Sequence, residues 1–104
     1  MSAPLHIAVE RDGFRTVVRC AGEIDHSSAV DLTRTLGDAM TSEAAGVVLD
    51  LTEVGFIDST GLHAVIMAAA SAEAVGMGFA VVPSEPVERL LELSGLRDIV
   101  QGRA

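Results

Sequence analysis

The stretch VVLDLTEVGFIDSTGLHAVIMAAA at residues 47–70 decides the fold, because its hydrophobic pattern changes along its length. Residues 47–51 are a short apolar run rich in β-branched side chains, which is typical of a central strand buried on both faces. We interpret residues 52–56 as a turn, in and after which apolar side chains occur again at Val54, Phe56 and Ile57. Beyond the polar residues 58–61, apolar side chains recur with helical spacing at Leu62, Val65, Ile66, Ala69 and Ala70. The stretch therefore predicts a buried strand, a loop and an amphipathic helix.

Apolar segments separated by glycine and proline continue this alternation on both sides. Upstream, residues 6–10 and 14–21 flank the tight-turn signal Asp12-Gly13 and predict an antiparallel hairpin. Asp25 or Ser27 is the expected N-cap of a helix before the central strand. One face of that helix carries Ala29, Leu32, Leu36, Ala39 and Met40.

Downstream of residue 70, Gly76 is well placed for a left-handed helix cap, and residues 79–82 predict another short strand. Ser84 is the expected N-cap of a last helix. Ile99-Val100 is a possible final strand. The predicted order is β-β-α-β-α-β-α, an α/β fold with a mixed sheet of about four or five strands covered by helices. The later β-α-β units should be parallel with right-handed crossovers, and residues 1–104 should form one domain.

Composition narrows the possible functions. The 104 residues include 15 acidic and 7 basic side chains, for a net charge of −8. An acidic chain repels the phosphate backbone, so we expect no direct nucleic-acid binding and no polybasic membrane patch. The longest apolar run, residues 64–70, is far short of the ~20 residues that span a membrane, and the start carries no signal-peptide pattern. We therefore expect a cytoplasmic protein.

The cysteine content limits which disulfides and metal sites the chain can form. Cys20 is the single cysteine, so the chain forms no internal disulfide and offers no cysteine cluster for zinc. We interpret Cys20 as a small buried hydrophobe at the end of a strand. No metal and no cofactor are predicted.

The polar cluster Asp58-Ser59-Thr60-Gly61 is the candidate functional site, because it lies where a loop enters a hydrophobic helix. Its simplest role is a helix cap, which suits aspartate, serine and threonine equally. A catalytic serine would require a G-x-S-x-G elbow, whereas Ile57 stands two residues before Ser59. A third possibility is a phosphorylation switch, since a phosphate adds about −1.5 to −2 charge where a partner would dock.

A serine triad would also need a histidine and a carboxylate within reach. His6, His26 and His63 are available, and the spacing of none of them favours a triad. A hydrolase nevertheless stays open to a simple test with an activated ester, compared with Ser59→Ala, for which we expect no turnover.

The chain resembles the anti-anti-sigma factors (anti-sigma factor antagonists), which are single STAS domains. Residues 22–25, Gly-Glu-Ile-Asp, resemble the family's G-E-[LIV]-D turn after the second strand. Residues 48–51 and 56–62 resemble its central strand, loop and D-S-[ST]-G-L helix start. Residues 87–90 and 94–96 resemble its C-terminal helix and S-G-L ending. Thr60 takes a place where many members have a second serine.

The resemblance implies a partner-switching mechanism without enzymatic activity in this chain. The unphosphorylated protein would bind an anti-sigma factor that is also an ATP-dependent serine kinase. This binding would release the sigma factor. Phosphorylation of Ser59 would end that binding, and a metal-dependent phosphatase would restore it. Thr60 would be a secondary acceptor. The partner-binding surface would comprise Asp25, Asp58, Ser59, Thr60 and Gly61.

Two further features of the family stay open. The resemblance implies a monomer when the protein is free of its partner. Some STAS domains are instead small subunits of lipid-transport ATPases and also carry a serine at the same helix start. The residues 22–25 and the Asp58-Ser59 pair favour the sigma pathway, and copurification with an ATP-binding cassette subunit would favour the transport role.

Overall fold

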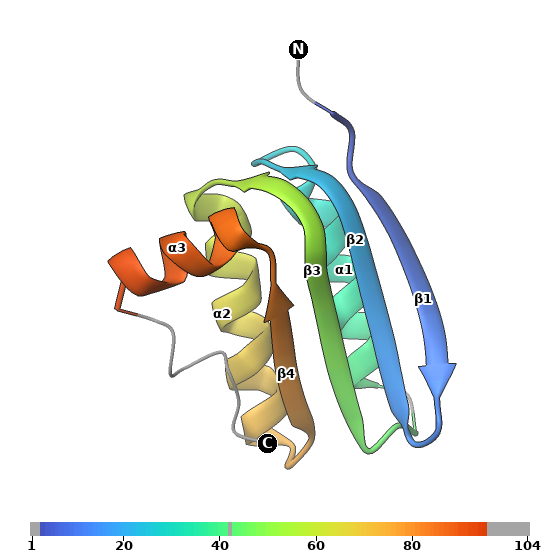
Figure 1. The fold of residues 1–104 in the computed structure, drawn as a ribbon. Helices are drawn as coiled ribbons and strands as arrows, with labels where there is room; N and C mark the ends of the chain where they lie inside the picture. The colour runs from blue at the N-terminus through green and yellow to red at the C-terminus, as the bar shows by residue number, and fades with distance from the viewer. Residues whose placement is uncertain (1–2, 42, 96–104) are drawn as a thin grey trace.

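The strands pair in the order in which they occur in the chain, β1-β2-β3-β4 (Figure 1). β1 (His6–Asp12) is antiparallel to β2 (Arg15–Ile24), whereas β3 (Gly46–Ile57) and β4 (Gly78–Pro83) run parallel to β2. The computed structural model describes residues 3–41 and 43–95. The predicted order and the mixed sheet are confirmed, with four strands, and the possible strand at Ile99-Val100 lies outside the described residues.

Helices α1 (Ala29–Met40) and α2 (Ser59–Ala74) lie side by side against one face of the sheet (Figure 1). α3 (Glu85–Leu93) packs against β3 and begins at its predicted cap, Ser84, whose hydroxyl accepts the Val87 N–H. The core between sheet and helices is apolar and includes Val18, Leu49 and Leu32, each fully buried. Among the described residues, no helix has both the length and the apolar character needed to cross a membrane.

The opposite face of the sheet carries no helix in the described part of the chain, and Figure 1 shows this face toward the viewer. Arg19 lies there on β2 and forms ion pairs with Glu10 on β1, at 3.0 Å, and with Asp50 on β3, at 3.2 Å. These exposed pairs connect three strands across the surface. The sheet thus has an apolar face against the helices and a partly charged face toward solvent.

β3 is longer than the sequence predicts, because residues 52–56 continue the strand and form no turn. The pairing with β2 shifts register twice, first between Arg19 and Ala21 and again between Gly22 and Glu23. Each shift inserts an extra residue into β3, as a β-bulge does. Consequently Leu51, Val54 and Ile57 are all buried although they are three residues apart. That spacing breaks the two-residue alternation of a strand and imitates a turn in the sequence.

The buried face of α2 differs from the predicted one. Its buried residues are Gly61, Leu62, Ala64, Val65, Ala68 and Ala72, whereas Ala70 is exposed and Ile66 and Ala69 are half-buried. The reason is that apolar residues surround the whole helix, so their spacing does not single out one face. The end of α2 is as predicted, since Gly76 follows it with φ +73°.

Candidate functional site

Asp58 connects the end of β3 to the start of α2 and caps the helix. Its Oδ1 accepts the backbone N–H groups of Thr60 and Gly61, each at 3.0 Å, and the Thr60 hydroxyl at 2.6 Å. A helix begins with N–H groups that lack partners within the helix, and the Asp58 carboxylate satisfies two of them. The cap predicted for this cluster is therefore Asp58, and Ser59 is the first residue of α2.

The hydroxyl groups of Ser59 and Thr60 differ in what they contact. Thr60 donates its hydroxyl hydrogen to Asp58. Ser59 is exposed, and its hydroxyl has no hydrogen-bond partner within residues 3–41 and 43–95. The fold therefore uses the Thr60 hydroxyl and leaves the Ser59 hydroxyl available to a partner.

A second turn of the same kind lies at Asp25, where β2 ends. Its Oδ1 accepts the N–H groups of Ser27 (3.1 Å) and Ser28 (3.0 Å) and the Ser27 hydroxyl (2.8 Å). α1 begins only at Ala29, so Asp25 caps the turn that precedes the helix, and Ser27 is not its N-cap as the sequence suggested. The N-cap residue is Ser28, whose hydroxyl accepts the Asp25 N–H at 2.9 Å.

The sheet brings the two turns together. Ile24 of β2 pairs with Ile57 of β3, and the Asp58 N–H donates to the Ile24 carbonyl at 3.0 Å. The next residue on each strand is the turn aspartate, Asp25 or Asp58. Two residues that are 33 positions apart therefore lie at neighbouring carboxyl ends of parallel strands, where α/β sheets commonly bind ligands.

Gly61 allows α2 to start close to these strand ends. A Cβ atom at Gly61 would lie 2.6 Å from Cγ2 of Ile24 and 2.8 Å from Cγ1 of Ile57. Both isoleucines are buried, so a larger residue would push the first turn of α2 away from the sheet. Gly61 therefore relieves crowding at the start of α2, and its place in the partner surface, which the family resemblance implies, stays a prediction.

Both turn aspartates are held in the charged form. The hydrogen bond from the Ser27 hydroxyl, helped by the Ser28 N–H, lowers the pKa of Asp25 to about 2. The Thr60 hydroxyl and the Gly61 N–H likewise lower the pKa of Asp58, although the like negative charge of Asp25 acts to raise it. Ser59 thus directly follows one anionic carboxylate, that of Asp58, and lies at the same end of the sheet as a second, that of Asp25.

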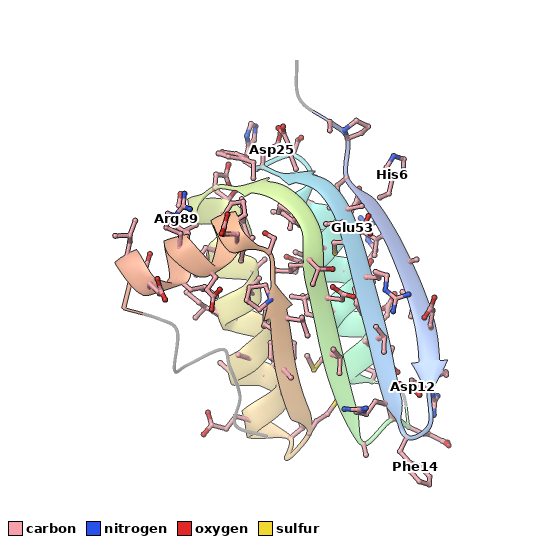
Figure 2. All side chains as sticks on the ribbon, in the orientation of Figure 1. His6, Asp12, Phe14, Asp25, Glu53 and Arg89 are labelled. Carbon is pink, nitrogen blue, oxygen red and sulfur yellow. The ribbon has the colours of Figure 1, made fainter. Side chains whose placement is uncertain are left out.

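No group of three or more His, Cys, Asp or Glu side chains in residues 3–41 and 43–95 is placed to hold a metal ion. Figure 2 shows Asp25 at the end of the sheet where β2 and β3 terminate, with Arg89 of α3 toward the same end. Arg89 forms an ion pair with Glu85 on its own helix, at 3.9 Å.

Sequence reasoning missed that the two turns are built alike. Both follow the pattern Asp-x-Ser/Thr, at residues 25–27 and 58–60, and in both the hydroxyl two residues after the aspartate donates to its carboxylate. This recurrence was visible in the sequence and could have predicted that Thr60 and Ser27 have structural roles.

Comparison with known families identifies the fold. The model of the STAS domain matches residues 6–104, nearly the whole chain. The chain belongs to the STAS domain family. The four strands and three helices of the described residues have the arrangement of this family as seen in SpoIIAA, described as an anti-sigma factor antagonist in its unphosphorylated form. That structure superposes with a TM-score of 0.76 at 22% identity and covers 95% of this chain and 89% of its own.

More similar relatives share the same description. An anti-sigma-B factor antagonist of Listeria monocytogenes is 35% identical over 97 residues, which is 88% of this STAS chain and 82% of the relative. An anti-sigma factor antagonist from Mycobacterium paratuberculosis has a known structure with a TM-score of 0.79 and 34% identity. The alignment covers 92% of this chain and 84% of that one.

Proposed function

We propose that this STAS domain is an anti-sigma factor antagonist that is switched off by phosphorylation of Ser59. The observation that carries the proposal is the free, exposed hydroxyl of Ser59 at the start of α2. The relatives that are about one-third identical over most of the chain are described as antagonists of anti-sigma factors, which supports this choice among STAS functions.

The hydrogen bonds favour Ser59 over Thr60 as the acceptor. Transfer of a phosphoryl group requires the acceptor oxygen to attack phosphorus and to lose its proton. The Thr60 hydroxyl donates to Asp58 at 2.6 Å, so its modification would remove this hydrogen bond and place a phosphate against the Asp58 carboxylate. The Ser59 hydroxyl can react without that loss. Thr60 is retained in the proposal only as a secondary acceptor.

In the proposed reaction, a partner kinase supplies ATP and magnesium. The Ser59 Oγ forms a bond to the γ-phosphorus, the bond to the β-phosphate oxygen breaks, and the serine proton goes to a base of the kinase. The chain itself contributes the presentation of the hydroxyl. The product carries about −1.5 to −2 additional charge next to Asp58, at the end of the sheet that also carries Asp25.

That charge explains how the switch acts on binding. The Asp58 carboxylate already occupies the N–H groups of Thr60 and Gly61, so the phosphate cannot use these donors. A partner docked over Ser59 would have to bury the phosphate beside two carboxylates. An unpaired buried charge costs ~3–5 kcal/mol, which corresponds to a roughly 100- to 4000-fold loss of affinity.

The remaining steps follow from this role. Binding of the unphosphorylated chain to the anti-sigma factor, in the cytoplasm, would free the sigma factor. A phosphatase of the metal-dependent class would remove the phosphate and restore binding. The chain itself would act as a regulator and not as an enzyme.

The decisive test measures binding to the anti-sigma factor kinase encoded in the same genome. Titration calorimetry should show tight binding of the wild type and of Ser59→Ala, and binding at least roughly 100-fold weaker for Ser59→Asp. Ser71→Asp is the matched control, because it adds the same charge to the exposed surface of α2, twelve residues further along the helix. It should bind like the wild type.

A phosphorylation assay completes the test. Incubation with the kinase and ATP should add one phosphate to the wild type and none to Ser59→Ala. Equal binding of Ser59→Asp and the wild type would contradict the switch. Copurification with an ATP-binding cassette subunit, together with no phosphate on Ser59, would assign the chain to transport.

A further inference from the structure

The second bulge of β3 determines where Phe56 points. Before the bulge, Gly22 pairs with Val54, and after it Glu23 pairs with Phe56 and Ile24 with Ile57. Val54 and Ile57 are both buried, at 1% and 6% exposure. In an unbroken strand the residue two positions after Val54 would also face the helices. The extra residue, Gly55, reverses that alternation and directs Phe56 away from the helices.

Phe56 is consequently exposed close to the candidate site. Its side chain is 48% exposed, whereas the Ile57 side chain beside it is buried. Its cross-strand neighbour is Glu23, which immediately precedes Ile24 and Asp25. Ser59 follows three residues after Phe56. Phe56 therefore places an aromatic side chain near the turns of Asp25 and Asp58, on the sheet face opposite to α1 and α2.

The charges around Phe56 indicate the kind of surface that would cover it. Glu23, Asp25 and Asp58 are all acidic and lie at the ends of β2 and β3, the strand that carries Phe56. Glu23, Asp25 and Asp31 also line one shared hollow beside this end of the sheet. A partner that approaches Ser59 meets the Phe56 ring among these acidic side chains, and Arg89, which is paired with Glu85 on α3, lies toward the same end of the sheet. The complementary surface of that partner is an apolar pocket bordered by arginine or lysine side chains.

We infer that Phe56 is an apolar anchor of the partner interface, which extends from Ser59 around the end of the sheet onto its open face. The occupant is the anti-sigma factor, through a basic-rimmed apolar pocket, and in this respect the inference rests on the proposed function. Aromatic side chains that enter a pocket at the centre of an interface carry a large share of its affinity. The acidic rim would guide association and the ring would slow dissociation.

The test compares two exposed phenylalanines of the same chain. Phe14 is 82% exposed in the β1–β2 hairpin, and Figure 2 shows it at the end of the sheet opposite to Asp25. Phe56→Ala should weaken binding to the anti-sigma factor by roughly 10- to 100-fold, mainly through faster dissociation. Phe14→Ala, the same change far from Ser59, should leave the affinity within about twofold. Phe56→Leu, which keeps an apolar side chain, should recover part of the loss.

The outcomes separate this inference from the function on which it rests. If Ser59→Asp loses binding while Phe56→Ala binds like the wild type, the switch stands and the anchor is wrong. If the wild type does not bind the anti-sigma factor, both are wrong. If sedimentation shows that Phe56→Ala abolishes a self-associated form and leaves partner affinity intact, the ring contacts a second copy of this chain, which also overturns the inference. Unchanged melting of Phe56→Ala ensures that an affinity loss reflects the interface.

Discussion

The turns at Asp25 and Asp58 are built alike but lead into their helices differently. In each, the aspartate accepts the N–H groups two and three residues ahead and a hydroxyl two residues ahead. After Asp25 the chain makes a turn before α1 begins at Ala29, whereas α2 begins directly after Asp58. The third residue after the aspartate also differs, since it is Ser28 in the first turn and Gly61 in the second.

The comparison separates positions that the fold uses from positions that it leaves open. The hydroxyls two residues after each aspartate are bonded in both turns, so they are structural. The residue directly after the aspartate is exposed in both, as His26 in one and Ser59 in the other. The turn does not require a particular side chain at that position, so the residue there can be one that a partner recognises. The Ser59 binding experiment tests this division with the largest expected effect.

Gly61→Ala should have the largest effect on stability, because its Cβ would overlap the buried side chains of Ile24 and Ile57. Overpacking of this kind costs about 1–3 kcal/mol in the free energy of unfolding. Urea denaturation of both proteins measures it. A stable Gly61→Ala variant would mean that close packing of α2 is not what distinguishes the second turn.

The control for this change is Gly37→Ala in the middle of α1. A Cβ at Gly37 meets nothing within 4 Å, so the substitution adds only helix propensity. It should raise the free energy of unfolding by about 0.5–1 kcal/mol. Opposite signs for two glycine-to-alanine changes in helices would show that contact with the strand ends decides the outcome.

Thr16→Val tests whether an unused hydroxyl by itself indicates function. Thr16 is 3% exposed on β2, and its hydroxyl has no hydrogen-bond partner within the described part of the chain. Replacing it with a methyl group of similar shape should stabilise the protein by about 1 kcal/mol, because a buried unsatisfied hydroxyl is removed. Thr16→Ser, which keeps the hydroxyl, should not. Anti-sigma factor binding should be unchanged, since only an exposed hydroxyl can serve a partner.

The smallest expected effects concern the charges of the two turns. Ser27→Ala should raise the pKa of Asp25 from about 2 toward its ordinary value, and Thr60→Val should raise the pKa of Asp58. Carboxyl NMR titrations measure both shifts. If neither pKa moves, the hydroxyls do not hold the carboxylates, and the two turns are not alike in chemistry.

The sign of the pH dependence follows from these lowered values. The folded pKa of Asp25 is below its unfolded value of about 3.9, so the stabilisation is complete above that value. It is lost as the pH falls from about 4 to about 2. Over this range the wild type should therefore lose more stability than Ser27→Ala, as measured by urea denaturation at each pH. Ser71→Ala, on the exposed surface of α2, should behave like the wild type.

The element order could be predicted from the sequence because local signals determine it. Asp12-Gly13 marks the hairpin, Ser84 caps α3, and Gly76 ends α2 with a positive φ. The continuation of β3 through residues 52–56 was missed, since two bulges space its buried residues by three. The buried face of α2 was missed in part for a different reason, namely that the helix is apolar all round.

Only part of the candidate site could be predicted in the same way. Asp58 and Ser59 are next to each other in sequence, so their position at a helix start followed from local pattern. The proximity of Asp25 to Asp58 depends on the pairing of Ile24 with Ile57, which no spacing in the sequence reveals. That relation was implied by family resemblance alone. The choice between the hydroxyls of Ser59 and Thr60 required the hydrogen bonds themselves.

The strand order β1-β2-β3-β4 has a consequence for how the chain folds. Each strand pairs with the strand before it in the sequence, so no later segment has to insert between strands that are already paired. Domains rich in sequence-local contacts fold faster than domains whose strands pair across long separations. The β1–β2 hairpin, whose strands are joined by a tight turn, is therefore the part of the sheet that can pair earliest, and the parallel strands join it as the domain folds as a unit.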